Sequence, residues 1–529
     1  MKLLSILFIV LCSAQHSIAQ DTQIIFLKEG TKSSQTENLN EHFTKKSLER
    51  REKHNAPFDQ YDVPVNEEIL NQLADDGEVL NVSKWLNAFT FKSTLSAEEL
   101  KEKYDFIERI QVVKSVPKPQ KNKFKVGAKS LDYGAASVQI EQLNIDCLHE
   151  QGFTGEGVYV GVIDAGFTNM ESIGYFDSVY LESRLIETFN FVNNGLTVYD
   201  FSGHGTAVTS CIVGEGSSPD QYTGSAVDVD LALYLSEDVS SETEIEEFYL
   251  VQALERADSM GVDVVNISLG YFGFDDSTTS HVYADLDGAT TISAMGVNVA
   301  KSKGIFVAMA AGNSGPSNIL TPCDATGGFC VGAVTAAGDY AWFSSVGPTA
   351  DGRVKPDVMA RGGEAWFVNA LDSLENGNGT SLATPIISGG VACLIQAHPT
   401  KTVDEIMDAV RESADLYNTP NDSMGYGIPD FCLANAILNG NVSVPTLLDE
   451  QLSIYPNPSD GKIFVSGLSE YSENPKVEIY DNLGRLVFTE RQKVATELTF
   501  DLSELGGGVY KLVLSQGETI VIQTIYLYQ

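Results

Sequence analysis

Four residues in this chain carry the side chains that cleavage of an acyl bond needs. Asp164 follows a short apolar run, His204 stands between two glycines, and Ser381 lies in the sequence Gly-Thr-Ser. A serine hydroxyl becomes a strong nucleophile when a histidine accepts its proton, and a carboxylate holds that histidine in the required tautomer. Asn313 adds a neutral amide, which can donate a hydrogen bond to the oxyanion of the intermediate. Together these residue types predict nucleophilic acyl transfer.

Each of these residues also has an ordinary structural interpretation. Asp164 could open a turn, Asn313 could shape a loop, and His204 or Ser381 could begin a helix. The chain order Asp, His, Ser is nevertheless one of the three established orders for a catalytic triad, and the Asn precedes the Ser. We favour the catalytic interpretation because all four residues occur together in one chain.

The residues after Ser381 predict a long buried helix. Pro385 is tolerated in a first helical turn, and the apolar residues that follow extend to Ala397. Ser381 would then lie at the helix N-terminus, where its amide N–H points outward and the helix dipole favours a negatively charged oxygen. One residue would therefore supply both the nucleophile and an oxyanion donor.

The elements that must position these residues lie between 130 and 440. Buried apolar runs, such as 158–163 and 304–310, alternate there with amphipathic helical patterns. This alternation predicts an α/β fold with a mostly parallel sheet and helices on both faces. Ligands bind such sheets beyond the carboxyl ends of the strands. Because Asp164 and Asn313 both follow predicted strands, we expect the chemistry at that edge.

These motifs resemble those of the subtilisin-like serine peptidases. The resemblance is carried by four segments, which are 163–166, 204–206, 311–313 and 379–385. It implies that Ser381 is the nucleophile, that His204 is the general base and then the general acid, and that Asp164 orients the imidazole. It also implies that Asn313 and the Ser381 amide bind the oxyanion.

The same resemblance implies where a substrate binds. Ser268-Leu269-Gly270 resembles the strand that pairs with an extended substrate backbone, and Ala310-Ala311-Gly312 resembles the other wall of the primary side-chain pocket. Three residues depart from the family pattern, because Ala165 replaces Thr or Ser, Leu382 replaces Met, and Arg361 replaces Pro. None of these departures removes a catalytic group. They bear on rate and pocket shape rather than on reaction type.

The start of the chain is predicted to be a secretory signal peptide over 1–19. Lys2 precedes the apolar run 3–11, and Ser17-Ile18-Ala19 fits a cleavage site between small residues. No later run approaches the ~20 apolar residues of a membrane-spanning helix. The sequence therefore predicts an exported chain without a transmembrane segment.

Residues 20–129 are predicted to form a small α+β unit followed by a Lys-rich linker. A half-buried strand is expected at 82–91, a helix with a capping box at Ser96, and a strand at 107–116. The linker, 117–129, is rich in lysine, and exposed linkers of this kind are where proteases cut. The unit is similar to the propeptides of the subtilisin-like family, which assist folding and block the cleft. Its removal after export is therefore predicted.

The end of the chain is predicted to be a β-sandwich over 451–529, preceded by a linker over 441–450. Short strands alternate with turn signals, and the segment has no histidine or cysteine, so we expect no catalysis from it. Its motifs at 455–458, 481–484 and 508–510 resemble the C-terminal sorting domain of type IX secretion in Bacteroidetes. That resemblance implies the secretion machinery as a partner. It also implies a location outside the cell or on the outer-membrane surface of a Gram-negative bacterium.

Composition limits the partners and cofactors. The 529 residues include 34 Lys and Arg against 72 Asp and Glu, which gives a net charge of −38. An acidic surface repels phosphate backbones, so nucleic acid is not an expected partner. Most of these carboxylates are expected to be solvated. The acidity and the family resemblance also allow structural calcium, with no ligands assigned, and the chemistry itself requires no cofactor.

Six cysteines remain after the signal peptide, and an even number in an exported chain permits disulfides. Cys323 and Cys330 flank a Gly-Gly loop, so we expect a bridge between them, whereas the other pairings stay open. No cysteine spacing resembles a zinc site.

The sequence as a whole predicts a secreted serine endopeptidase that hydrolyses peptide bonds in proteins through an acyl-enzyme intermediate. A catalytically silent adhesion or binding protein on the same scaffold is the main alternative, and the intact set of four residues argues against it. A processing peptidase with one protein target and a broad scavenger are not distinguished, because selectivity depends on loop shape.

Overall fold

The computed structural model of the chain describes residues 21–33, 39–113, 133–216, 221–440, 453–466, 476–480, 486–491, 497–503, 505–516 and 519–528. All of these residues fall within three segments. We call 21–113 the N-terminal unit, 133–440 the central unit and 453–528 the C-terminal unit. The predicted signal peptide and the two predicted linkers lie outside the described residues.

Seven parallel strands form the sheet of the central unit. Their order is β13-β12-β11-β10-β5-β9-β6, and each neighbouring pair is parallel. The strands are β5 (Tyr159–Asp164), β6 (Leu185–Asn190), β9 (Asp230–Leu235), β10 (Val264–Ile267), β11 (Phe306–Ala310), β12 (Phe329–Val334) and β13 (Val358–Arg361). The predicted parallel α/β fold is confirmed.

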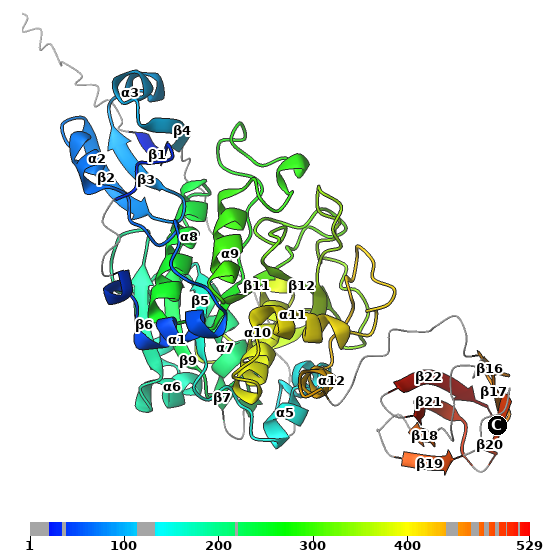
Figure 1. Cartoon of the computed structure of the whole chain (residues 1–529). Helices are drawn as coiled ribbons and strands as arrows, with labels where there is room; N and C mark the ends of the chain where they lie inside the picture. Colours follow the sequence, from blue (N-terminus) through cyan, green and yellow to red (C-terminus); the bar gives the residue numbers. More distant parts are fainter. Residues whose placement is uncertain are drawn as a thin grey trace, which may run out of the picture.

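Helices cover both faces of this sheet (Figure 1). The four long ones are α7 (His204–Val213), α8 (Ile245–Met260), α9 (Ile292–Ser302) and α10 (Thr380–Ala397). Successive residues of a strand point to opposite faces. Val162 therefore packs in the core shared with α7 and α10, whereas Ile163 packs in the core shared with α8 and α9. Of the described helices only α10 is long and apolar enough to cross a membrane, and 83% of it is buried inside the fold.

Smaller elements complete the central unit. The helices are α4 (Ser137–Glu141), α5 (Asp146–Glu150), α6 (Asp177–Leu181), α11 (Val403–Glu412) and α12 (Phe431–Leu438). The strands are β7 (Glu215–Gly216), β8 (Tyr222–Thr223), β14 (Ala365–Val368) and β15 (Leu374–Gly377). Short 3-10 turns lie at Met170–Ser172, Gly174–Phe176 and Tyr283–Asp285.

Two disulfides join parts of the central unit. The expected bridge between Cys323 and Cys330 is confirmed. A second bridge, from Cys147 in α5 to Cys432 in α12, resolves a pairing that the sequence left open. The remaining two described cysteines, Cys211 and Cys393, are buried free thiols.

The N-terminal unit contains a four-stranded antiparallel sheet in the order β2-β3-β1-β4. Its elements are β1 (Asp21–Leu27), a 3-10 turn (Leu39–His42), α1 (Lys45–Lys53), α2 (Glu67–Gln72), β2 (Gly77–Ser83), β3 (Ala88–Ser93), α3 (Ala97–Lys103) and β4 (Ile107–Val113). The predicted capping box is confirmed, because Ser96 and Glu99 bond each other's backbone N–H. The single strand predicted at 82–91 is wrong. The chain turns between Ser83 and Ala88, where Asn87 takes a positive φ of 48°.

The C-terminal unit contains two antiparallel sheets around one small core. One sheet has the order β16-β17-β20 and the other β19-β18-β21-β22. The strands are β16 (Ser453–Tyr455), β17 (Lys462–Ser466), β18 (Lys476–Tyr480), β19 (Leu486–Arg491), β20 (Glu497–Asp501), β21 (Gly508–Gln516) and β22 (Thr519–Leu527). Buried Val465 and Phe500 from one sheet and Ile479 and Leu512 from the other belong to the same core. This is the predicted sandwich.

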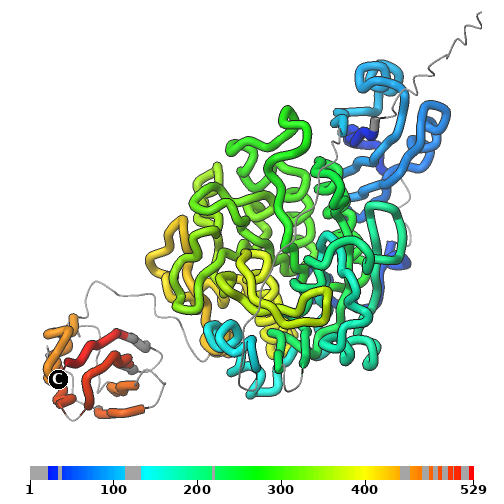
Figure 2. Tube along the Cα trace, turned by 180° about the vertical axis from the view of Figure 1, so that it is seen from behind, coloured from blue at the N-terminus to red at the C-terminus, as the bar shows by residue number. Residues whose placement is uncertain are grey.

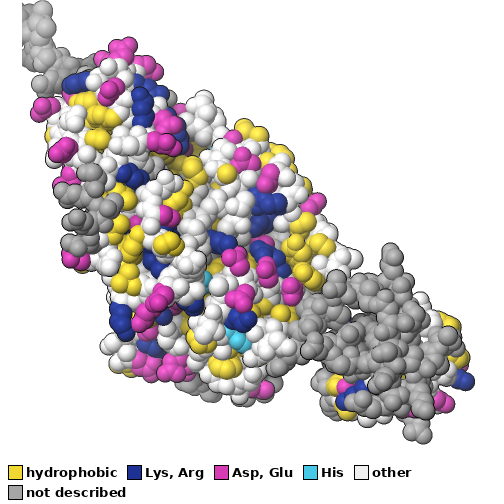
Figure 3. Space-filling model, viewed as in Figure 1, with side chains coloured by type: hydrophobic (Ala, Val, Ile, Leu, Met, Phe, Trp, Pro, Cys, Tyr) yellow, Lys and Arg dark blue, Asp and Glu magenta, His cyan; other side chains and the backbone are white. Residues whose placement is uncertain are grey.

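On the face drawn in Figure 3, charged side chains of both signs are spread out rather than gathered in one patch. Asp and Glu lie among Lys and Arg there, over both the N-terminal and the central unit (Figure 3). The acidic balance of the chain is therefore spread over this face as solvated charge, as expected from its composition.

Candidate active site

Asp164 and His204 form a hydrogen-bonded pair at the carboxyl edge of the sheet. Asp164 is the last residue of β5 and is fully buried, and His204 is the first residue of α7. His204 Nδ1 lies 2.8 Å from Asp164 Oδ1, which also accepts a hydrogen bond from the Ala165 backbone N–H at 2.7 Å. The His204 side chain is 38% exposed, so its other nitrogen can be reached from solvent. The pair has the geometry that a buried acid needs to orient a histidine.

Two glycines allow this pair to form. Gly166 has a φ of 138°, and a Cβ there would lie 2.5 Å from the Ser202 backbone nitrogen. A Cβ on Gly205 would lie 2.5 Å from the Gly166 carbonyl oxygen, to which the Gly205 N–H donates at 3.0 Å. The segment after β5 can therefore lie directly against the start of α7. That close approach brings His204 onto Asp164.

The environment of His204 favours its protonated form. Burial lowers the pKa of the imidazole, but the charge and hydrogen bond of Asp164 more than offset this, and the pKa lies above its ordinary value. Asp164 Oδ2 is buried and has no hydrogen-bond partner among the described residues. The contact through Oδ1 places the carboxylate where it would stabilise an imidazolium at His204.

Ser381 and Asn313 face a common space beside the start of α10. Ser381 is the second residue of α10, and Asn313 follows β11. A Cβ on Gly379 would lie 2.9 Å from Ser381 Oγ and 3.8 Å from Asn313 Nδ2. Asn313 Oδ1 accepts hydrogen bonds from Thr380 N at 2.9 Å and Thr380 Oγ1 at 3.1 Å. With its oxygen occupied in this way, the amide turns its nitrogen, a donor, toward the serine side.

The two predicted substrate segments lie at the same edge. Ser268 follows β10, and its hydroxyl donates to the Ser381 carbonyl oxygen at 2.9 Å. Gly312 follows β11, and its N–H donates to Thr380 Oγ1 at 3.1 Å. Ser268-Leu269-Gly270 and Ala310-Ala311-Gly312 are therefore both held against the start of α10. The structure brings all the predicted site segments to the carboxyl ends of β5, β10 and β11.

One contact of a complete triad is not formed. No hydrogen bond joins Ser381 Oγ to His204 within the part of the chain that the structure describes. Catalytic hydrogen bonds are often long in unliganded enzymes and tighten when substrate binds. The arrangement therefore contains a histidine oriented by Asp164 and a serine at the N-terminus of α10.

Sequence reasoning missed Glu237, a second carboxyl group near this pair. Its negative charge contributes to the raised pKa of His204. Burial raises the pKa of Glu237 itself to about 7, and the carboxyl accepts hydrogen bonds from Tyr271 Oη at 2.6 Å and Ser236 Oγ at 3.0 Å. The sequence held a signal for it, because Glu237 stands two residues after the apolar run 231–235, where a predicted strand would end.

The expected structural calcium has no evident ligand set. Among the described residues no group of three or more His, Cys, Asp or Glu side chains is placed to hold a metal ion. Calcium binding therefore stays a prediction from composition and resemblance, and nothing in the chemistry below depends on it.

Comparison with known proteins links this geometry to a family. Residues 155–427 match the subtilase family, also described as peptidase S8. Over 297 residues the chain is 32% identical to subtilisin from Bacillus pumilus, an alignment that covers 54% of this chain and 92% of that protein. It is 31% identical to subtilisin NAT from Bacillus subtilis subsp. natto, covering 54% of this chain and 67% of that protein.

The flanking segments match families of their own. Residues 22–128 match the peptidase S8 propeptide domain of Bacteroidota, and residues 453–527 match the secretion system C-terminal sorting domain. The three matches follow one another along the chain without overlap, in the order propeptide, peptidase and sorting domain.

Proposed function

The chain belongs to the subtilase family and is a serine-type endopeptidase, and on that premise we propose that Asp164, His204 and Ser381 are its catalytic triad. The observation that carries the proposal is the 2.8 Å contact between the buried Asp164 carboxylate and His204 Nδ1. It fixes the imidazole with its other nitrogen accessible, at the edge of the sheet where Ser381 begins α10.

The proposed reaction proceeds through an acyl-enzyme. Ser381 Oγ attacks the carbonyl carbon of the scissile peptide bond while His204 Nε2 accepts the hydroxyl proton. The tetrahedral intermediate collapses when His204 returns that proton to the leaving amine, and the C–N bond breaks. A water molecule then attacks the ester, with His204 again taking and returning a proton. Asp164 keeps Nδ1 protonated and stabilises the imidazolium in both halves.

Asn313 and the Ser381 backbone N–H are proposed to bind the oxyanion. The Asn313 amide is neutral, so it can stabilise charge that develops in the transition state without carrying charge of its own. Thr380 supports this role, because its N–H and hydroxyl both bind Asn313 Oδ1. We assign Thr380 as a positioning residue for the amide.

Substrate is proposed to lie between Ser268-Leu269-Gly270 and Ala310-Ala311-Gly312. Support comes from the hydrogen bonds that hold both segments against the start of α10, next to Ser381. An extended peptide that pairs with the first segment would place a side chain against the second. Proteins and peptides are the proposed substrate class.

We propose the following division of the chain. The signal peptide is 1–19, the propeptide with its linker 20–129, the peptidase domain 130–440, the second linker 441–450 and the sorting domain 451–529. The propeptide is proposed to inhibit the enzyme until the linker is cut. The sorting domain directs type IX secretion, so the protein is extracellular or on the cell surface.

Hydrolysis of a protein substrate tests the triad. Ser381→Ala should lower kcat by about 10⁶, the loss that removal of the triad serine causes in subtilisin. Ser172→Ala is the matched control, since Ser172 is an exposed serine of the same unit whose hydroxyl donates to Asn169 O. Full activity of the Ser381 variant would refute the assignment.

A further inference from the structure

The N-terminal unit contacts the central unit in two separate places. Its β-sheet packs on α8 and α9, since Ile24, Phe26 and Trp85 share a hydrophobic core with those helices. The second place is formed by residues 39–62, which we call the strap. The strap leaves the sheet after β1 and carries α1 along the outside of the central unit (Figures 1 and 2).

The strap binds the end of the sheet that lies away from the candidate active site. Arg50 donates to the carbonyls of Val262 and Lys303, and Lys46 donates to the carbonyl of Gly157. These acceptors come just before β10, β11 and β5. The same three strands end at Ile267, Ala310 and Asp164, on the side where the candidate active site lies. A six-residue strand such as β5 spans about 20 Å, so the two surfaces are separated by the length of the sheet.

The strap also caps the carboxyl end of α8. The last carbonyl groups of a helix have no partner within it. Here Asp258 O accepts from Ser47 Oγ at 2.5 Å, while Ser259 O and Met260 O accept from the N–H and the hydroxyl of Thr44 at 2.9 and 2.8 Å. The Arg50 guanidinium lies at the same end, where the helix dipole favours a positive charge. The strap therefore completes a helix of the central unit.

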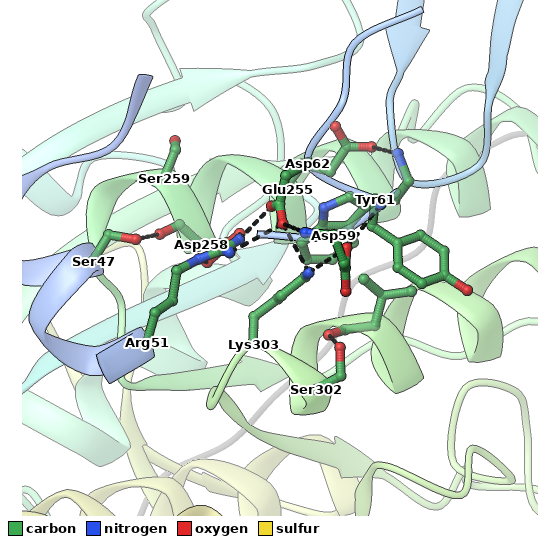
Figure 4. Close-up of polar contacts among 12 residues, drawn as sticks. Ser47, Arg51, Asp59, Tyr61, Asp62, Glu255, Asp258, Ser259, Ser302 and Lys303 are labelled. Carbon is green, nitrogen blue, oxygen red and sulfur yellow. Dashed lines mark hydrogen bonds and ion pairs between the residues drawn. The ribbon is translucent and has the colours of Figure 1, made fainter. Parts of the chain in front are cut away.

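A network of buried ion pairs holds the strap in one position on the central unit (Figure 4). Asp258 of α8 is bound by both Arg50 and Arg51 of α1. Arg51 also binds Asp62 at 2.6 Å, and Asp62 binds Lys303 of the central unit at 3.0 Å. All five side chains are at most 4% exposed. Each surface thus presents both signs of charge, and each charge meets its opposite.

We propose that this end of the central unit is a second docking surface, separate from the cleft, that keeps the N-terminal unit bound after the linker is cut. Its partner is the strap of the same chain, recognised by adjacent arginines that meet Asp258 and by an aspartate that meets Lys303. Departure of the strap breaks the ion pairs of Asp258 and Lys303 and removes the hydrogen-bond donors from the last carbonyls of α8. Retention of the N-terminal unit then rests on the strap in addition to the sheet that packs on α8 and α9.

Controlled cutting of the linker tests the proposal. The protein used is the full chain with Ser381→Ala and with a recognition site for a sequence-specific protease inserted between 114 and 132. After this protease has cut the chain, size-exclusion chromatography shows whether the N-terminal fragment is released, and its dissociation rate is measured. We expect the fragment to stay bound. Arg50→Ala with Arg51→Ala should weaken binding by about 10²–10³-fold. Lys45→Ala with Glu49→Ala, an exposed pair on the same helix, should leave it unchanged.

A variant on the central unit keeps the test decisive if the arginine variant does not fold. Asp258→Asn keeps the size of the side chain and removes the charge that both arginines meet, so it should also release the fragment. Release of the parent fragment on cutting, equal release by the arginine and control variants, or full retention of the fragment by Asp258→Asn would overturn the proposal. Because the added protease makes the cut and binding is the readout, the result does not depend on the triad.

Discussion

Asp164 and Asp258 are equally buried, yet their surroundings differ in a way that matches their proposed roles. Both are fully buried, one at the carboxyl edge of the sheet and the other at the end of α8 near the opposite edge. Asp258 has two arginines on its carboxylate. Asp164 Oδ2 has no partner among the described residues. Asp258 therefore meets two permanent cations, whereas Asp164 meets a cation at His204 only when that imidazole is protonated, as it becomes during the proposed reaction.

Among the variants that compare the two aspartates, Asp164→Asn is expected to have the largest effect. The amide removes the charge that stabilises the imidazolium and favours the wrong His204 tautomer, so kcat should fall by about 10⁴. Folding should be little affected, because the side chain keeps its shape. Steady-state hydrolysis and urea unfolding of the same preparation separate the two effects. If the variant unfolds easily but retains its kcat, Asp164 has a structural role like that of Asp258 and not a catalytic one.

For Asp258 we expect a substitution to lower the stability of the chain. Asp258→Ala leaves Arg50 and Arg51 buried without their anion, which should lower the free energy of unfolding by about 3–5 kcal/mol. Urea unfolding of the uncut Ser381→Ala chain measures this. Glu49→Ala, which removes an exposed partner of Lys45 on α1, should change the value by less than about 1 kcal/mol. Equal losses from both variants would show that the buried network is not what holds the strap.

Asn313→Ala tests whether this side chain is an oxyanion donor at the catalytic edge. The negatively charged oxygen of the tetrahedral intermediate loses one hydrogen-bond donor, so kcat should fall by about 10²–10³ with KM little changed. This magnitude is the one found for the corresponding asparagine of subtilisin. The variant should still react slowly with a fluorophosphonate, since Ser381, His204 and Asp164 remain. A large rise in KM with kcat preserved would instead make Asn313 a substrate-positioning residue.

The smallest expected effect is a shift in the pH dependence of kcat/KM. Protonated His204 cannot accept a proton, so kcat/KM should fall as the pH drops through its pKa. Asp164 holds that pKa above its ordinary value of about 6.5, so the acidic midpoint should lie above pH 6.5. Glu237→Gln removes a smaller favourable charge and should move the midpoint to lower pH. The assignment of Glu237 fails if the midpoint does not move or rises.

Much of the site could be predicted because short motifs carry it. Asp164, His204, Ser381 and Asn313 each stand in a local sequence that also fixes the turn or helix start around them. The Cys323–Cys330 bridge was predictable because the two residues are close in sequence. In contrast, the partial apolar alternation of 82–91 predicts one strand, whereas these residues span the turn between β2 and β3.

The strap interface could not be predicted from local patterns. Arg50 and Asp258 are 208 residues apart, and Arg50 lies in a short helix whose charged sequence is typical of a solvated surface. Only the fold shows that the residues before β10 and β11 meet this helix. Polar contacts of high sequence separation depend on topology, which the hydrophobic pattern of either segment alone does not specify.

The most direct test of the account is to identify which residue a fluorophosphonate modifies. The reagent reacts with a serine hydroxyl only where a neighbouring base has activated it. We expect the mature wild-type enzyme to carry a single adduct, located by peptide mass spectrometry on Ser381, with labelling strongly reduced in Asp164→Asn. An adduct on another serine, or undiminished labelling of Ser381→Ala, would contradict the assignment of Asp164, His204 and Ser381 as the catalytic triad.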